Sequence, residues 1–214
     1  MHRARQEMPK TWVLKKKGTK YISANGNTNT VPIFVVIRDM MNIAKNRKEV
    51  KKILKEKEVK INNKKINDNK FPVGLNDTIE IDKKYYILIL GENKKLLVKE
   101  IKENSDKKIL KVINKKSVKN NKIQVNCTNG RNYLVDNKES KKIKVGCSVI
   151  VDLKNKKIID ILPLEAGKEV LIIKGKHIGK RGIIEKIDFG KKIAEIKSKN
   201  EKINVLLDYL MVEK

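Results

Sequence analysis

Aromatic residues make up only 4% of this sequence of 214 residues, with one tryptophan, three phenylalanines and five tyrosines. Proteins that hold single-stranded nucleic acid mainly by stacking bases on aromatic side chains depend on such residues. The composition therefore argues against base stacking as the main mode of recognition.

Cysteine and histidine are also scarce, with two of each. Cys127 and Cys147 can form one bridge at most, and nothing indicates an oxidising compartment, so we expect buried or idle thiols. His2 and His177 lie far apart and have no cysteine at metal-ligand spacing. The sequence predicts no metal site, and we expect no cofactor.

Long hydrophobic runs are missing. The longest apolar stretches, residues 31–37 and 85–90, are far too short to cross a bilayer. No signal peptide of the charged, apolar and small pattern opens the sequence. We therefore expect a soluble, cytoplasmic protein without a membrane partner.

Acidic residues are few beside the basic ones, 25 against 52, which gives a formal net charge of +27 and a pI of about 10.0. Such an excess repels itself in the free protein and attracts polyanions. A hydrophobic fraction of 39% can still bury small cores, so wholesale disorder is excluded. The sequence predicts a folded protein that binds a polyanion.

The first 31 residues carry seven Lys or Arg and one acidic residue, with little periodicity, and residues 23–30 are a polar run typical of a loop. An extension this basic is usually unpacked until an anionic surface orders it. We predict that it is mobile in the free protein and threads into its polyanionic partner, where Trp12 gains a packing partner; a merely solubilising tail is the alternative. The candidate binding residues here are Arg3, Arg5, Lys10, Trp12, Lys15, Lys16 and Lys17.

Residues 32–91 begin with two predicted helices. Apolar residues follow helical spacing over residues 33–44, after Pro32 in a first turn. Asn46 suits the N-cap of the second helix, with Glu49 in capping-box position. Val50, Ile53 and Leu54 form the apolar side of that helix.

The other side of the second helix is covered by cations with almost no acid to balance them. A solvated surface is the default for one amphipathic helix, but this imbalance favours an anion-binding face. The candidate residues of the helical region are Arg38, Lys45, Arg47, Lys48, Lys51, Lys52 and Lys57.

Short strands are predicted for the rest of the chain. Residues 59–66 form a hairpin around Asn62-Asn63, residues 71–75 a loop, and residues 78–81 and 85–90 two strands. Residues 92–163 read as all-β, with hairpin turns at Asn129-Gly130 and at residues 154–157. Arg131, in the first of these turns, is a candidate phosphate ligand. Strands at short spacing in residues 164–214 suit a small closed barrel.

A glycine-rich loop is the sharpest motif. Gly175, Gly179 and Gly182 allow a tight loop, in which the backbone can approach a ligand, and its cations suit phosphate oxygens. Its spacing fits neither a Walker A motif nor a dinucleotide fingerprint. A structural turn with incidental lysines is the alternative. The candidate residues of the loop are Lys174, Lys176, His177, Lys180 and Arg181.

Three resemblances follow from these residues. The stretch from Gly167 through Lys174–Gly182 to Ile187 resembles the KOW motif of ribosomal proteins and transcription elongation factors, which implies an SH3-like barrel. Residues 44–53 and 59–63 resemble the small RNA-binding domain of ribosomal proteins numbered four, which implies that the two helices and the hairpin contact RNA.

The order of the parts, together with residues 8–12, 33–39 and 71–75, resembles the S4e family of small-subunit ribosomal proteins, in an archaeal-type member. The resemblance implies an α+β, mostly β protein with a basic extension (1–31), a helical RNA-binding module (32–91), a central β domain (92–163) and a KOW barrel (164–214). It also implies a ribosome-bound protein whose partners are small-subunit ribosomal RNA and neighbouring ribosomal proteins.

Three functions compete at this point. A structural ribosomal protein that binds ribosomal RNA accounts for the whole chain. The targeting part of an RNA-modifying enzyme would need a catalytic domain, for which there is no room, so we expect neither an enzyme nor a small-molecule substrate. A KOW-type transcription or translation regulatory factor explains only the C-terminal barrel.

Overall fold

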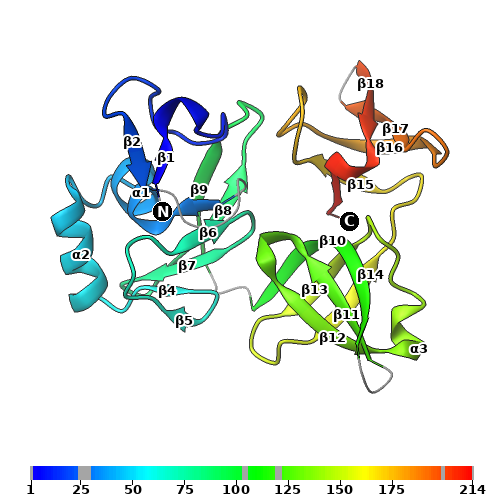
Figure 1. Cartoon of the computed structure of the whole chain (residues 1–214), viewed down its shortest axis with the longest axis horizontal. Helices are drawn as coiled ribbons and strands as arrows, with labels where there is room; N and C mark the ends of the chain where they lie inside the picture. The colour runs from blue at the N-terminus through cyan, green and yellow to red at the C-terminus, as the bar shows by residue number, and fades with distance from the viewer. Residues whose placement is uncertain (1, 24–29, 103–105, 119–121, 199–200, 214) are drawn as a thin grey trace. The chain divides into compact units, whose positions relative to one another are not determined.

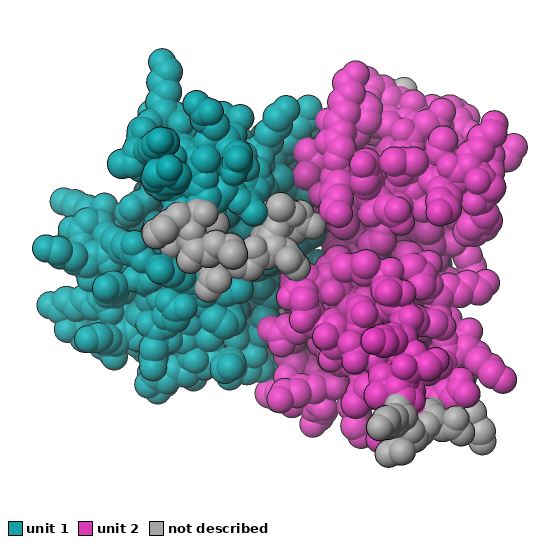
Figure 2. Space-filling model, viewed as in Figure 1, with its two compact units in different colours: residues 1–106 teal, residues 107–214 magenta. Residues whose placement is uncertain are grey.

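The structure of the protein, a computed structural model, is mostly β with few, short helices (Figure 1). It describes residues 2–23, 30–102, 106–118, 122–198 and 201–213. The chain forms two compact units, residues 1–106 and 107–214, coloured separately in Figure 2. The predicted mostly β composition is confirmed, whereas residues 24–29 of the predicted polar loop lie outside the described residues.

The largest sheet of the first unit is antiparallel, in the order β5-β4-β7-β8-β9. Its strands are β4 (Lys60–Ile61), β5 (Lys64–Lys65), β7 (Thr78–Ile81), β8 (Lys84–Leu90) and β9 (Leu96–Ile101). The predicted turn is confirmed, since Asn62 and Asn63 join β4 to β5 with φ of 50° and 64°, a conformation that asparagine tolerates. Because β9 pairs with β8 along its length, residues 96–101 complete this sheet.

The first predicted helix is shorter than its pattern indicates. α1 (Ile33–Val35) runs into the π-helix η2 (Val36–Met40). The Met41 N–H still makes a π-helical hydrogen bond to the Val36 carbonyl, and the helix ends after it because Asn42 takes a left-handed φ of 55°. The predicted loop at residues 71–75 is also wrong in part, because β6 (Pro72–Gly74) pairs with β3 (Thr30–Pro32).

The second helix, α2 (Arg47–Glu56), follows its prediction closely. The Asn46 side chain accepts a hydrogen bond from the Glu49 N–H at 3.0 Å, so the predicted N-cap is confirmed. The Glu49 carboxylate in turn accepts from the Lys45 N–H at 2.7 Å. Val50 and Leu54 are buried as expected, whereas Ile53 is half-buried.

The basic N-terminal segment is packed, which corrects the prediction of an unpacked arm. β1 (His2–Ala4) pairs with β2 (Tyr21–Ser23), with the short helix η1 (Arg5–Glu7) after β1. Trp12 is only 2% exposed, and the Leu96 N–H donates to the Thr11 carbonyl at 2.8 Å. Hydrophobic burial and this hydrogen bond to β9 stabilise the packed segment more than the repulsion among its cations destabilises it. The apolar residues of the segment follow no regular spacing, so neither the burial nor the hydrogen bond could be predicted from sequence.

The second unit consists of two five-stranded antiparallel sheets, in the orders β12-β11-β10-β13-β14 and β18-β17-β16-β15-β19. The strands of the first are β10 (Lys107–Val118), β11 (Lys122–Cys127), β12 (Asn132–Asp136), β13 (Ser148–Asp152) and β14 (Ile158–Leu162). Those of the second are β15 (Glu169–Ile172), β16 (Arg181–Asp188), β17 (Ile193–Ser198), β18 (Glu201–Leu206) and β19 (Leu210–Val212). Its short helices are η3 (Thr128–Gly130), α3 (Asn137–Ser140) and η4 (Leu207–Tyr209).

Each sheet of the second unit encloses its own apolar core. Both predicted hairpin turns are confirmed, as β11 joins β12 through Asn129-Gly130, and β13 joins β14 through residues 153–157. Cys127 and Cys147 are free, buried thiols in the first core, as expected. Burial raises the pKa of Cys127 to about 12, so this thiol stays protonated and inert.

Lysines occupy the tips of four hairpins in a left-handed backbone conformation. They lie between β7 and β8, β8 and β9, β13 and β14, and β16 and β17: Lys83, Lys94, Lys156 and Lys192, with φ between 53° and 64°. Glycine and asparagine adopt this conformation more readily than lysine. These turns therefore place a cation where the backbone alone favours another residue.

Within the described part of the chain, no helix is long and apolar enough to cross a membrane. The same residues contain no group of three or more His, Cys, Asp or Glu side chains placed to hold a metal ion.

Candidate nucleic-acid interface

Two arginines of the first unit lie over one aromatic ring. The guanidinium carbons of Arg38 and Arg47 are 5.4 Å and 5.3 Å from the centre of the Phe34 ring. Phe34 and Arg38 are four residues apart at the helical start of the module, and Arg47 begins α2. Cations over a ring face are attracted by its quadrupole, which holds both arginines close together despite their like charge.

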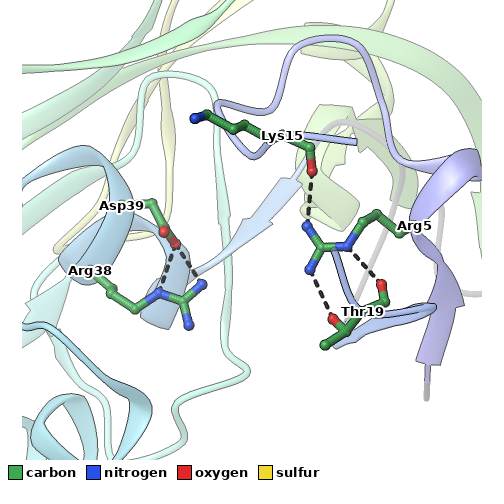
Figure 3. Close-up of polar contacts among 5 residues, drawn as sticks. All are labelled: Arg5, Lys15, Thr19, Arg38 and Asp39. Carbon is green, nitrogen blue, oxygen red and sulfur yellow. Dashed lines mark hydrogen bonds and ion pairs between the residues drawn. The ribbon is translucent and has the colours of Figure 1, made fainter. Parts of the chain in front are cut away.

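The two arginines differ in what else they contact. Arg38 donates from Nε and Nη2 to one oxygen of Asp39, at 3.0 and 2.8 Å (Figure 3). Arg47 donates from Nη2 to the Asn69 side-chain oxygen at 3.2 Å, and its buried Nε has no partner among the described residues. Arg47 is therefore positioned by neutral groups, whereas the guanidinium of Arg38 is engaged by a carboxylate.

The exposed side of α2 presents a row of lysines, as the sequence predicts. Val50 and Leu54 bury the opposite side, which fixes the direction in which the lysines point. The exposed members are Lys48, Lys51, Lys52 and Lys55, with the exposed Lys45 just before the helix. Lys52 lies 3.7 Å from the Glu56 carboxylate, and Lys57 forms an ion pair with Asp82. Exposed ion pairs of this kind contribute little free energy, so an anion can compete for these lysines.

The N-terminal candidates separate into three kinds. Lys10, Lys15, Lys16 and Lys17 are exposed, and Arg3 is partly exposed on β1. Trp12 is buried, so its ring is not available to stack on a base. The side chain of Arg5 is hydrogen-bonded within its own segment (Figure 3).

The glycine-rich loop joins β15 to β16 in the second unit. A side chain at Gly175 would come within 3.0 Å of the Tyr209 ring, and one at Gly182 within 2.5 Å of the Lys197 carbonyl oxygen. Gly182 is thus required by packing inside the unit. Gly175 and Gly179 have left-handed φ values of +88° and +89°, so the predicted tight loop is confirmed, and the approach of a ligand to it stays a prediction.

The cations of this loop are partly neutralised. Lys180 pairs with Glu201 at 2.9 Å, and Arg181 donates through Nε to Glu213 at 2.8 Å. Lys180 lowers the pKa of the Glu201 carboxyl by hydrogen bonding and charge. Lys174 and Lys176 are exposed and His177 is partly exposed, so these side chains are accessible to an anion in solvent.

Lys111 links this loop region to the hairpin that contains Arg131. Its side chain, 4% exposed, donates from Nζ to the Leu207 carbonyl at 2.8 Å, and its backbone N–H donates to Thr128 Oγ1 at 3.2 Å. Burial, with Lys174 nearby, lowers the pKa of Lys111 to about 8, against an opposing effect of Asp208. Lys111 therefore contacts η4 with its side chain and the turn that precedes Arg131 with its backbone.

The structure thus gathers the predicted residues into separate clusters in each unit. In the first unit it adds Phe34 and Asn69, which the sequence analysis missed. The spacing of Phe34 and Arg38 by four residues could have shown that pair, whereas the contact of Asn69 with Arg47 spans 22 residues and had no local signal. In the second unit it adds Lys111, because a lysine within a strand gives no sign of burial.

Two families match parts of the chain. Ribosomal family S4e matches residues 82–158, and the S4 domain matches residues 32–79.

Several archaeal proteins are similar over most of their length, all carrying the name small ribosomal subunit protein eS4. The protein of Nanoarchaeum equitans is 35% identical, over 84% of this chain and 79% of its own. That of Methanospirillum hungatei is 34% identical, over 87% and 80%, and that of Caldivirga maquilingensis 30%, over 99% and 94%.

The fold has a solved counterpart, the crystal structure of the 30S ribosomal protein S4e from Thermoplasma acidophilum. It superposes with a TM-score of 0.73 at 28% sequence identity, covering 86% of this chain and 94% of the other. Sequence and fold therefore agree over most of the chain.

Proposed function

This chain belongs to the ribosomal protein S4e family, and on that premise we propose that it is a structural constituent of the small ribosomal subunit that binds ribosomal RNA. Its partners are small-subunit ribosomal RNA and neighbouring ribosomal proteins, and its location is the ribosome in the cytoplasm. The relatives, matched over most of their length, carry the name small ribosomal subunit protein eS4. That observation carries the proposal.

The physical basis is charge. A net charge of +27 releases condensed counterions from RNA when lysines and arginines reach its phosphates. Folded RNA is recognised mostly through shape and backbone contacts, for which aromatic residues are not required. The few aromatic residues of this chain, of which Trp12 is buried, fit that mode of binding.

We assign RNA contacts to three surfaces. The first is the helix surface, formed by Lys45, Lys48, Lys51, Lys52 and Lys57 with Arg38 and Arg47. The second is the N-terminal segment with Arg3, Lys10, Lys15, Lys16 and Lys17. The third, in the second unit, comprises Arg131, Lys174, Lys176, His177, Lys180 and Arg181.

The finer architecture belongs to the same proposal. We divide the chain into a basic segment (1–31), a helical RNA-binding module (32–91), a central β domain (92–163) and an SH3-like KOW barrel (164–214). The boundary after residue 91 precedes β9, which pairs with β8 in the sheet of the first unit. The glycine-rich loop between β15 and β16, within a five-stranded antiparallel sheet, supports the last of these.

The alternatives explain less of the chain. A regulatory factor built on a KOW barrel accounts for residues 164–214 only, whereas the matched families cover residues 32–79 and 82–158. An RNA-modifying enzyme would carry a catalytic domain beyond the parts described above.

Crosslinking to RNA in extracts of cells that make the protein, followed by sequencing of the bound RNA, tests the proposal. We expect small-subunit ribosomal RNA to dominate the crosslinked reads. Crosslinks mainly to messenger or transfer RNA would overturn the ribosomal assignment in favour of a regulatory factor or an RNA-modifying enzyme.

A further inference from the structure

A lysine-rich loop in the first unit, residues 13–20, is here called the lysine loop. Its four lysines are all exposed: Lys15, Lys16, Lys17 and Lys20. Residues 8–38 contain no acidic residue at all, so the sequence around the loop offers no local counter-charge. Four like charges within six residues repel one another, and a flexible loop would spread them apart.

Arg5 holds this loop in one conformation. Its Nε donates to the Thr19 carbonyl at 2.7 Å, Nη1 to the Lys15 carbonyl at 2.9 Å, and Nη2 to Thr19 Oγ1 at 2.9 Å. Figure 3 shows the Lys15 carbonyl turned toward the guanidinium while the Lys15 side chain extends away from it. The planar fork of one arginine thus fastens both ends of the lysine run.

Gly18 shows how closely the loop packs on this guanidinium. A Cβ at residue 18 would lie 3.1 Å from the Arg5 Cζ, and the φ of Gly18 is +136°, which side chains rarely adopt. The loop backbone therefore approaches Arg5 as closely as it does only because residue 18 has no side chain.

The ends of the loop are anchored as well. On one side, the buried Trp12 accepts a hydrogen bond at its carbonyl from Lys95 Nζ at 2.8 Å. On the other, the Arg5 N–H donates to the Lys20 carbonyl at 2.9 Å, where β2 begins beside β1. The loop is therefore fixed at both ends and in its middle.

We infer that Arg5 is a positioning residue, which holds the lysine loop as a preformed site for the phosphates of an RNA backbone. This rests on the proposed function and adds the role of one residue to it. Because the backbone is already ordered, binding avoids most of the entropy cost of arranging four repelling cations. The guanidinium itself is directed at the loop backbone and Thr19, and the lysines make the contacts.

Two substitutions test this role without changing the net charge. Arg5→Lys keeps the cation but lacks the fork, and Thr19→Val removes the Oγ1 acceptor together with the hydrogen bond that this hydroxyl donates to the Tyr21 carbonyl. We expect Arg5→Lys to weaken binding of the full chain to small-subunit ribosomal RNA transcribed in vitro by about tenfold at fixed salt. Thr19→Val should weaken it less, and Thr19→Ser, which keeps the hydroxyl, should restore it. Lys64→Arg, an exposed exchange on β5, serves as the charge-preserving control.

A double-mutant cycle separates positioning from direct contact. Changing Lys15, Lys16, Lys17 and Lys20 to Gln should flatten the slope of log affinity against log salt by about 3 units. In that background, Arg5→Lys should have no further effect. An equal further loss would show that Arg5 contacts RNA itself, which overturns the positioning role.

Two more outcomes decide the inference. Arg5→Lys and Thr19→Val binding as tightly as wild type would overturn it while leaving the proposed function intact. Failure of the wild-type chain to bind the transcript would overturn both. The single tryptophan reports folding, because a buried Trp12 keeps its fluorescence blue-shifted; if Arg5→Lys unfolds, the pair Thr19→Val and Thr19→Ser still gives the answer.

Discussion

Lys111 is a cation that the fold has taken out of water. Its ammonium group donates to a backbone carbonyl of η4 and has a pKa of about 8, against an ordinary value of 10.5. Between these two values the unfolded chain binds more protons than the folded one, so the free energy of unfolding rises with pH. A pH-dependent stability therefore follows from one side chain.

The rise should be visible mainly between about pH 8 and 9. Above that, the buried thiols oppose it, because the pKa of Cys127 is raised from 9.0 to about 12 and the folded state then binds more protons. Lys111→Met should abolish the contribution of the lysine, which amounts to no more than about 3 kcal/mol. Urea unfolding of the wild-type and Lys111→Met proteins from pH 7.5 to 10.5 measures this contribution as the difference between their slopes of unfolding free energy against pH. Parallel plots for the two proteins would contradict the lowered pKa of Lys111.

On the proposed assignment of Arg38 to RNA contact, Asp39 competes with RNA for this arginine. Its carboxylate accepts two hydrogen bonds from that guanidinium, next to the Phe34 ring. Asp39→Asn frees the arginine and removes a negative charge, so we expect RNA affinity to rise about threefold or more. Filter binding at fixed salt measures this. Glu100→Gln, which removes a charge from an exposed position on β9, should change affinity less; an equal gain would mean that only net charge matters.

At the scale of elements, α2 depends on its first turn. The Asn46 side chain satisfies the Glu49 N–H, one of the donors that a helix start leaves without a partner. Asn46→Ala should lower the free energy of unfolding by about 1 kcal/mol, and Asn46→Asp should retain most of it. Denaturant titration distinguishes the two; equal losses would show that the cap does not stabilise α2.

The N-terminal segment contributes buried apolar side chains to the first unit. Met8, Trp12 and Ile22 are all buried. Trp12→Ala should cost about 3 to 5 kcal/mol in free energy of unfolding, and removal of residues 1–29 should lower the melting temperature markedly. A truncated chain that melts like the full one would restore the prediction of an unpacked arm.

Local chemistry decided which elements were predictable. Asn46, Asn62-Asn63 and Asn129-Gly130 act through their own backbone conformations, so the cap and the hairpins followed from sequence. The segment around Trp12 is hydrogen-bonded to β9, more than 80 residues away, and the pairing of β3 with β6 spans about 40. Long-range contacts of this kind leave no local pattern. For the candidate site, the sequence likewise shows which residues carry charge. It does not show which of those residues already form ion pairs within the protein.

For the whole molecule, charge governs association. At physiological salt, nearly all of the protein should sediment with the small ribosomal subunit, because +27 is spread over both units. High salt should release it, since each phosphate contact contributes about 0.7 to 0.9 to the slope of log affinity against log salt. Sucrose-gradient fractions at increasing salt show this, and a large free pool at physiological salt would favour a regulatory factor.

The left-handed lysines at the hairpin tips bear on how such a protein would respond to laboratory evolution. Exchanging Lys83, Lys94, Lys156 and Lys192 for glycine or asparagine relieves about 1 kcal/mol of backbone strain at each tip. A selection for heat tolerance carried out without RNA would accept all four exchanges. It would return a chain that is harder to melt and has lost a cation from the outermost point of four hairpins.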